Sequence, residues 1–417
     1  MAPNSRSKTP GPEPPLGIDT LAVQSAIHDL LGTARPFVQP IVPSVGFTHP
    51  SLADLDQAFS YQGGPTPADA NCYVYARYGA PNASALEEAV ALLEGARGAV
   101  SFASGMAALH AALLALVPHG SALVAAEQLY GITRTMLGTL AKAMGLQVHF
   151  VDFLDLAAVR AVTEKVRPSC LLCEVLTNPL VRVIQIGAVA EIAHRAQATL
   201  LIDNTFATPF LLRPLELGAD VVVHSATKYL NGHGDVLGGI ALGSPETMQI
   251  VNQHRRVLGA MPSAFDGWLA LRGLRTFALR MRQACSSAQQ IAEWLSRQAC
   301  IKRVYYPGLP GDDCHAAARS MFRAGFFGAM IAFEVKNLDR AGAFALVERL
   351  KLVRPVTSLG DIYSLILHPA STSHRWLTIE QREAQGITEG VLRLSIGIED
   401  PADLIPDLNQ ALLSTEC

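Results

Sequence analysis

The fold is most clearly indicated by residues 199–228, TLLIDNTFATPFLLRPLELGADVVVHSATK. Two apolar runs in this stretch, Thr199–Ile202 and Asp220–His224, have the length and the branched side chains of strands buried on both faces. Polar residues follow each run at once, Asp203 after the first and Ser225 after the second. Because parallel strands of an α/β sheet bind ligands beyond their carboxyl ends, the two strand ends should contribute to one site.

Alternating helices and apolar strands extend this pattern in both directions, which predicts a large, mostly parallel sheet. A helical stretch over 264–298, interrupted at Gly273, should connect the sheet to a smaller C-terminal region of mixed α and β structure. The fold class is therefore α/β, with a second, smaller α+β domain. The expected strands upstream of residue 199 are Ala99–Phe102, Ala122–Ala125, Gln147–Val151 and Ser169–Glu174.

Four segments follow from composition along the chain. Residues 1–16 are rich in proline and poor in apolar side chains, so a disordered tail is expected. Residues 17–75 combine a short helix over 18–31 with extended, proline-broken segments, which is typical of an arm that lies on another body. Residues 76–272 form the large domain, and residues 273–417 form the C-terminal domain.

Bulk properties exclude several classes of partner. The 417 residues carry a formal net charge of −3, with both signs interspersed, so neither nucleic acid nor a membrane surface is expected as a partner. The odd number of cysteines, 7, indicates a reducing, cytoplasmic location. Cys170 and Cys173 form a CxxC within an apolar run, where strand alternation would separate their sulfurs, so no metal site is expected.

The residues after the two strands in 199–228 predict a cofactor site. A carboxylate such as Asp203 can keep the ring nitrogen of pyridoxal 5′-phosphate (PLP) protonated, so that the ring accepts electrons from a carbanion. The Ser225-x-Thr227-Lys228 sequence offers two hydroxyls to a phosphate and an amine to the cofactor aldehyde. Taken singly, Asp203 could cap a turn and Lys228 could be a surface lysine, but two consecutive strand ends favour the site.

A third element fits the same cofactor. The strand Ala99–Phe102 leads through Ser104, Gly105 and Met106 into a helix, and backbone amides at a helix N-terminus favour an anion such as phosphate. This turn is weak evidence alone, since many such loops contain Ser-Gly. It lacks the further glycines or the Gly-Lys pair of nucleotide-binding loops.

The segment His224–Asp235, HSATKYLNGHGD, closely resembles the lysine motif of the Cys/Met-metabolism family of fold-type-I PLP enzymes. This trans-sulfuration family includes cystathionine γ-synthase, cystathionine γ-lyase, methionine γ-lyase and the O-acylhomoserine sulfhydrylases. The resemblance extends from about Phe37 onward. It implies the fold-type-I architecture, with a large PLP domain and a smaller C-terminal domain, and small amino-acid substrates.

The resemblance also implies roles for individual residues. Lys228 would form the Schiff base with PLP, and Asp203 would pair with the pyridinium. The phosphate would be bound by Ser225, Thr227 and the backbone amides of Gly105 and Met106. Tyr130 would stack on the ring and serve with Lys228 as a catalytic proton donor, while Asn178, in the segment that begins at Glu174, would approach the ring hydroxyl.

Further residues are implied at the substrate end and at a subunit interface. Arg393 matches the arginine that binds the substrate α-carboxylate, and Ser358 lines the same end of the site. Tyr75 and Arg77 resemble residues that reach the phosphate from a neighbouring subunit. The arm would then contact that subunit, so a homo-oligomer is expected, at least a dimer and by family resemblance a tetramer built as a dimer of dimers.

The expected reaction is γ-elimination or γ-replacement on a sulfur amino acid or homoserine derivative, and the sequence leaves this choice open. Ile132 replaces the cysteine of methionine γ-lyases, and Arg256 with Val257 replaces their Lys-Asp pair. Tyr363 replaces the glutamate that could meet the distal ammonium of cystathionine. These departures predict a substrate with a small or uncharged distal end. The alternatives are a β-eliminating C–S lyase and a catalytically inactive scaffold with the same fold.

Overall fold

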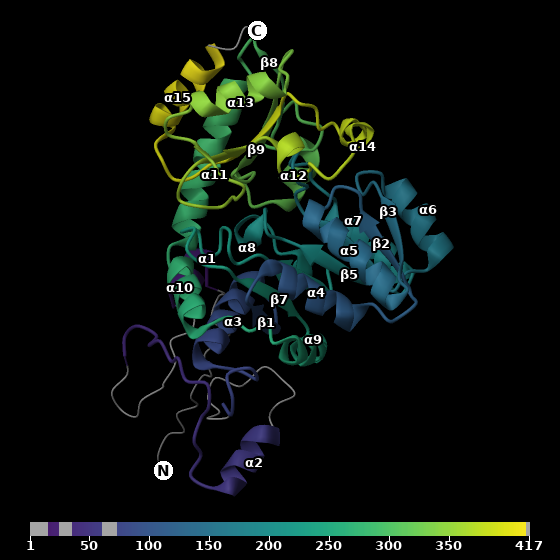
Figure 1. The fold of residues 1–417 in the computed structure, drawn as a ribbon, viewed down its shortest axis with the longest axis vertical. Helices are drawn as coiled ribbons and strands as arrows, with labels where there is room; N and C mark the ends of the chain where they lie inside the picture. Colours follow the sequence, from purple (N-terminus) through teal and green to yellow (C-terminus); the bar gives the residue numbers. More distant parts are fainter. Residues whose placement is uncertain (1–15, 25–35, 61–72, 414–417) are drawn as a thin grey trace, which may run out of the picture.

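A computed structural model describes residues 16–24, 36–60 and 73–413 of the chain. The tail expected over 1–16 lies, apart from Leu16, outside the described residues. Two sheets organise the described part, a larger one in the middle of Figure 1 and a smaller one towards the C-terminus. The two-sheet architecture confirms the predicted α/β class with a smaller C-terminal domain, while the boundary at residue 273 stays a prediction.

The larger sheet has seven strands in the order β1-β7-β6-β5-β4-β2-β3. All neighbouring strands run parallel except β7, which is antiparallel to both β1 and β6. The strands are β1 (Gly98–Phe102), β2 (Ala122–Ala126), β3 (Gln147–Val151), β4 (Cys170–Glu174), β5 (Thr199–Asp203), β6 (Val221–His224) and β7 (Gly239–Gly243). The six strands expected from the sequence are confirmed as β1 to β6.

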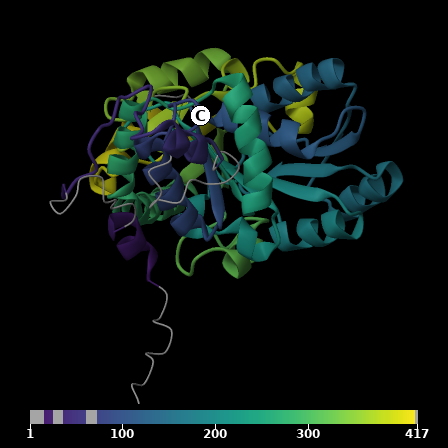
Figure 2. The ribbon, with the colours of Figure 1, turned by 90° about the horizontal axis from the view of Figure 1, so that it is seen from below.

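Helices cover both faces of this sheet and bury most of its apolar strand residues, although the edge strand β3 is only partly buried (Figures 1 and 2). The helices are α3 (Pro81–Glu94), α4 (Gly105–Leu116), α5 (Gly131–Met144), α6 (Leu156–Val166), α7 (Ile186–Arg195), α8 (Thr208–Leu211), the 3₁₀ helix η1 (Pro214–Leu217) and α9 (Pro245–Leu258). The sequence analysis did not predict α9, although Ser244 caps its N-terminus and Gly259 ends it in the left-handed conformation.

Strand β7 also escaped prediction, because glycines flank its short apolar run. Glycine is required at residue 239 because the backbone of Ser104 lies very close to it. A Cβ on Gly239 would lie 2.1 Å from the carbonyl oxygen of Ser104, so only glycine lets the turn before α4 rest on β7. This contact holds the N-terminus of α4 against the edge of the sheet where β6 ends.

Helices α10 (Ala264–Leu274) and α11 (Phe277–Leu295) connect the two sheets. The predicted interruption at Gly273 is wrong in position, since Gly273 is helical and the break lies at Arg275 and Thr276. Gly273 serves close packing instead. A Cβ there would lie 2.2 Å from the carbonyl oxygen of Asn231, in the loop that follows β6.

The smaller sheet has five strands in the order β10-β11-β12-β9-β8 and its own hydrophobic core. The antiparallel pairing of β12 with β11 and β9 places Arg393 on a central strand. Its elements are β8 (Ile301–Tyr305), α12 (His315–Met321), β9 (Met330–Val335), α13 (Arg340–Arg349), β10 (Arg354–Pro355), β11 (Leu365–Leu367), η2 (Pro369–Ser371), α14 (Ile379–Ala384), β12 (Val391–Ser395) and α15 (Pro401–Leu413).

The N-terminal arm is only partly described. The helix expected over 18–31 is seen as α1 (Ile18–Gln24), and the rest of that range lies outside the described residues. A helix that was not predicted, α2 (Leu52–Ser60), lies at the end of the molecule opposite the C-terminal domain (Figure 1). The extended segment joins the body through a bridge between Gly46 and Tyr75. Phe37 on this segment is 94% exposed.

None of the described helices is both long enough and apolar enough to cross a lipid bilayer.

Candidate active site

A cavity of about 550 Å³ lies at the carboxyl ends of the parallel strands, and the C-terminal domain closes one side of it. It brings together most of the residues selected from the sequence. Those in its lining are Gly105, Met106, Tyr130, Ile132, Asn178, Asp203, Ser225, Thr227, Lys228 and Arg393. The two strand ends of 199–228 therefore do share one cavity, as expected.

Lys228 lies in the turn that follows β6, and its side chain extends towards the C-terminal domain. Its Nζ donates a hydrogen bond to the Ser358 hydroxyl at 2.9 Å. Burial and then the positive charge of Arg393 lower the pKa of Lys228 to about 8, against an opposing effect from Asp361. A substantial fraction of this amine is therefore neutral near pH 8, the form that a nucleophile or base requires.

Two carboxyl groups lie side by side at the sheet edge. Glu174 ends β4 and Asp203 ends β5, and the parallel register pairs these two residues directly. Burial raises the pKa of Asp203, although hydrogen bonds from Thr205 oppose this. Burial and then the neighbouring Asp203 raise the pKa of Glu174 well above its usual range. Glu174 is thus the one of the pair that holds a proton more readily.

The N-terminus of α4 forms another wall. Ser104 caps the helix by accepting a hydrogen bond from the amide of Ala107 at 3.2 Å, so the amides of Gly105 and Met106 have no intrahelical acceptor. A Cβ on Gly105 would lie 2.8 Å from the Cβ of Ser225, which brings the helix N-terminus against the turn after β6. In the same turn the Thr227 hydroxyl donates to the carbonyl of Gly238 at 3.2 Å.

Arg393 is 3% exposed and closes the cavity from β12. Its Nη1 donates to Asn178 Oδ1 at 2.7 Å and its Nη2 to the carbonyl of Ser358 at 3.2 Å. Its Nε has no hydrogen-bond partner among the described residues, although it is buried. Burial lowers the pKa of this guanidinium to about 10. A buried cation with a free donor requires an anion to satisfy it.

Tyr130 stands at the N-terminus of α5, with its ring 38% exposed. Its backbone amide donates to Glu174 Oε1 at 2.6 Å, which ties the start of α5 to the end of β4. The phenol is therefore held at the open side of the cavity by a contact through its own backbone.

Comparison with known proteins supports the cofactor that the residues in the cavity predict. Residues 19–413 match the family described as Cys/Met metabolism PLP-dependent enzyme. The chain belongs to this family. Its cofactor is accordingly PLP, and it is a lyase or transferase of the trans-sulfuration type, as the resemblance implied.

Individual members carry different activities. An L-methionine gamma-lyase of Fusobacterium nucleatum subsp. polymorphum is 37% identical over 95% of this chain and 98% of its own length. An O-succinylhomoserine sulfhydrylase of Pseudomonas aeruginosa is 41% identical, over 81% of this chain and 83% of its own. A cystathionine beta-lyase of Coxiella burnetii is 42% identical, over 82% and 87%.

Among solved structures, cystathionine gamma synthase from Xanthomonas oryzae pv. oryzae matches with a TM-score of 0.88 and 36% identity. The match covers 97% of this chain and 99% of that one. The likeness confirms the fold-type-I architecture across both sheets.

The cavity fits PLP in charge and in donors. The free amides at Gly105 and Met106 suit a phosphate, and the largely neutral amine of Lys228 suits an aldehyde. A protonated ring nitrogen would offset the burial that raises the pKa of Asp203. Gly105 leaves no room for a side chain at the point where a phosphate would approach the helix.

Five predicted residues are not in the lining of the cavity: Tyr75, Arg77, Arg256, Ser358 and Tyr363. Arg77 instead stacks over Tyr78, with its Cζ 4.8 Å from the ring centre, and donates to the carbonyl of Arg256 at 3.1 Å. Neither arginine has a carboxylate partner among the described residues. Tyr363 is 55% exposed. The roles of these five residues stay predictions.

Sequence reasoning missed a buried network beneath the site. Glu94 on α3 and His224 on β6 are both at most 1% exposed, and His224 Nε2 lies 3.1 Å from Glu94 Oε2. Asn204, the residue that follows Asp203, donates a hydrogen bond from its Nδ2 to Glu94 Oε1 at 3.2 Å. His224 also lowers the pKa of Asp203. An isolated glutamate at the end of an apolar helix was the available signal.

Sequence reasoning also missed the segment after η2. Ser371, Thr372, Ser373, Arg375 and Trp376 all line the cavity. His374 anchors this segment, since it is 3% exposed and its Nε2 lies 3.2 Å from the carbonyl oxygen of Asn178.

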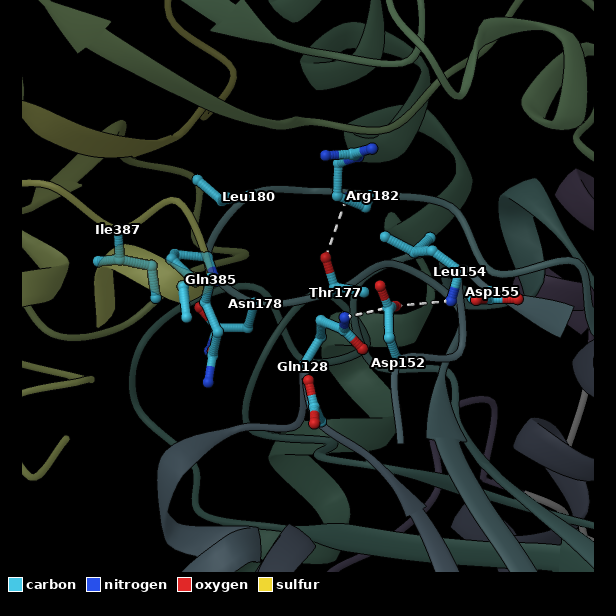
Figure 3. Close-up of a pocket in the computed structure, with 13 residues that line it drawn as sticks. Gln128, Asp152, Leu154, Asp155, Thr177, Asn178, Leu180, Arg182, Gln385 and Ile387 are labelled. Carbon is cyan, nitrogen blue, oxygen red and sulfur yellow. Dashed lines mark hydrogen bonds between the residues drawn. The ribbon is translucent and has the colours of Figure 1, made fainter. Parts of the chain in front are cut away.

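A second cavity, of about 290 Å³, lies behind Asn178 (Figure 3). Gln128 donates to Asp152 across it at 2.7 Å, and the backbone amide of Arg182 donates to the Thr177 hydroxyl at 3.0 Å. Its lining contains no lysine and shares only Asn178 with the larger cavity. The chemistry selected from the sequence therefore belongs to the larger cavity.

Proposed function

We propose that this enzyme catalyses γ-elimination or γ-replacement on a γ-substituted L-amino acid, a sulfur amino acid or a homoserine derivative. The observation that carries the proposal is the pairing, in one cavity, of the amine of Lys228 with the buried guanidinium of Arg393. The first can exchange a proton with a substrate carbon, and the second can bind a carboxylate. Membership of the trans-sulfuration family supports γ chemistry in general.

Arg393 binds the substrate α-carboxylate in this proposal. Two of its nitrogens are already held by Asn178 and Ser358, so the guanidinium is fixed before substrate arrives. Its Nε has no hydrogen-bond partner among the described residues, so it can donate a hydrogen bond to the substrate carboxylate. Because the group is buried, little rearrangement or water remains to weaken the contact.

Lys228 moves the protons. Its pKa of about 8 leaves both the neutral and the protonated amine accessible near physiological pH. The neutral amine removes the proton from Cα, and the protonated amine can return it further along the substrate. Bound PLP supplies an electron sink for the negative charge that develops at Cα. Asp203 keeps that sink protonated.

Tyr130 is the proposed proton donor to the group that leaves from Cγ. Tyr130 lines the cavity and is 38% exposed, and its backbone amide is fixed by a hydrogen bond to Glu174 at 2.6 Å. Ile132 stands next to it in the lining and is 40% exposed, so the leaving group meets an apolar side chain there. No thiol is present at this position to contribute to substrate choice.

We further propose that the active form is a homo-oligomer, at least a dimer, in which Tyr75 and Arg77 complete the site of a neighbouring subunit. The exposed arm and the absence of both residues from the lining within one chain support this. We also propose a cytoplasmic location, which fits the free thiols of Cys170, Cys173, Cys285 and Cys314 among the described residues.

The cofactor assignment is tested with Lys228→Ala. The purified protein should show an absorbance band near the visible edge that borohydride removes, and the variant should lack it. Lys142→Ala, on the exposed side of α5, is the matched control and should retain the band. An unchanged band in Lys228→Ala would refute the role of Lys228.

The reaction is tested by identifying the keto acid. γ-Elimination gives 2-oxobutanoate from a four-carbon skeleton, whereas β-elimination of cystathionine gives pyruvate. The identity to the cystathionine beta-lyase of Coxiella burnetii makes β-elimination the second candidate. Assays with homoserine esters, methionine and cystathionine, with and without a thiol, should yield 2-oxobutanoate or a thioether. Pyruvate as the sole product would establish a β-lyase. No turnover of any substrate would favour a catalytically inactive scaffold.

A further inference from the structure

The larger cavity contains a second arginine at its solvent-exposed end. Several lining residues there are exposed, and only Arg375 among them carries a charge. The others are Tyr130, Ile132, Leu237, Thr357 and Trp376. The open end of the cavity is thus an apolar rim with a single cation.

The position of Arg375 follows from the anchoring of its segment. His374 is buried against the carbonyl of Asn178, and the carbonyl oxygen of Ser373 packs so tightly on Gly131 that a Cβ there would lie 2.7 Å away. The next two side chains therefore face outwards over the cavity. Arg375 stacks on Trp376, with its Cζ 5.3 Å from the ring centre, a contact that positions the guanidinium without neutralising it.

The charge of Arg375 is not balanced within the chain. No carboxylate among the described residues lies within ion-pair distance of it. The carboxyl groups in the lining are Glu174 and Asp203, both at the sheet edge. Glu174 is already engaged by the amide of Tyr130, and its raised pKa reduces its charge. The rim therefore has a net positive charge that an anion can satisfy.

We propose that Arg375 is a specificity-determining residue that binds a carboxylate at the distal end of the substrate's γ-substituent. The inference rests on the proposed function, in which Arg393 takes the α-carboxylate and leaves the rim for the γ-substituent. The substrate class is a homoserine half-ester of a dicarboxylic acid. This changes the expectation of a small or uncharged distal end, which came from the departures at Ile132, Arg256 and Tyr363. The glutamate missing at Tyr363 removes a site for a distal ammonium, and Arg375 supplies a site for the opposite charge.

The matched substrates O-succinyl-L-homoserine and O-acetyl-L-homoserine test this directly, because they share the reacting atoms and differ in the distal carboxylate. The holoenzyme should have the higher kcat/KM for the succinyl ester. Arg375→Gln should lower kcat/KM for that ester about tenfold, mainly through KM, and leave the acetyl ester within about twofold. Tenfold corresponds to about 1.4 kcal/mol, within the range for a hydrogen bond to a charged group. Arg375→Lys should retain part of the preference.

Arg319→Gln, on the exposed side of α12, is the control for loss of a surface positive charge and should not alter the ratio of the two kcat/KM values. An Arg375→Gln variant that lowers kcat/KM for both esters equally, or for neither, would overturn the assignment. An equal effect would point to a structural or subunit contact. Failure of the proposed function would look different, because the wild-type enzyme would then turn over neither ester, nor methionine or cystathionine.

Discussion

Replacing Lys228 with methionine should make the cofactor-free protein more stable at pH 7. The folded protein lowers the pKa of this amine from 10.5 to about 8, mainly by burial. At about 1.4 kcal/mol per pH unit, keeping the amine protonated in the folded state costs about 3 kcal/mol. Loss of the hydrogen bond to Ser358 offsets about 1 kcal/mol of this. The expected net gain for Lys228→Met is therefore about 2 kcal/mol.

The pH dependence of this gain has a definite sign. Below pH 8 the amine is protonated in both the folded and the unfolded chain, so the full cost is present. Between pH 8 and 10.5 the folded protein releases the proton while the unfolded chain keeps it, and the cost falls. At pH 10 only about 1 kcal/mol remains, which the lost hydrogen bond cancels. The stability gain should thus disappear at high pH.

Urea unfolding of the cofactor-free proteins, followed by circular dichroism at pH 7 and pH 10, measures this difference. Equal protomer concentrations are needed, because assembly shifts apparent stability. Lys142→Met, an exposed lysine on α5, is the control and should shift the midpoint little at either pH. A midpoint for Lys228→Met at or below that of the wild type at pH 7, or a gain that persists unchanged at pH 10, would refute this reasoning.

Three further changes test the site. Arg393→Lys should raise KM about 10- to 100-fold and leave the cofactor absorbance intact, because a lysine keeps the charge but not the forked donors of the guanidinium. An unchanged KM would contradict the proposal that Arg393 binds the substrate α-carboxylate. Glu94→Ala should destabilise the protein by about 1–3 kcal/mol, because it leaves the buried polar groups of His224 and Asn204 without their partner. Glu94→Gln should cost less, since glutamine keeps a side-chain oxygen; equal unfolding midpoints for the two variants would argue against this hydrogen-bonded network. Asn178→Asp should weaken substrate binding, measured as KM, by giving Arg393 an internal carboxylate, with little change in thermal stability.

The sequence predicts the larger sheet well because its strands are buried on both faces. Continuous apolar runs such as Cys170–Glu174 and Val221–His224 are distinct from the helices around them, and the residues that follow them reach the same sheet edge. Asp203, Lys228 and the Gly105 turn were all located in this way. Strand β7 was missed since its glycines, which serve close packing against Ser104, weaken the strand pattern.

Contacts between distant segments could not be predicted in the same way. The buried pair of Glu94 and His224 joins residues 130 positions apart. The glutamate at the end of an apolar helix is a signal for a buried partner, but no pattern in the sequence identifies His224 as that partner. Arg375 likewise acquires its place only because His374 is anchored to the backbone of Asn178, 196 positions away. Periodicity reports which face of an element is buried, but it does not report which distant element covers that face.

The active-site cavity has walls from two separate sheets, and these walls do different work. The larger sheet supplies Lys228 and Asp203, which in the proposed mechanism set the chemistry at Cα. The C-terminal domain supplies the rim segment with Arg375 and Trp376, held by a single buried histidine. We therefore expect substitutions in that short segment to change which leaving group is accepted while Lys228 and its surroundings stay as they are. One scaffold can in this way serve relatives with different substrates, and a laboratory redesign of this enzyme should begin at the rim.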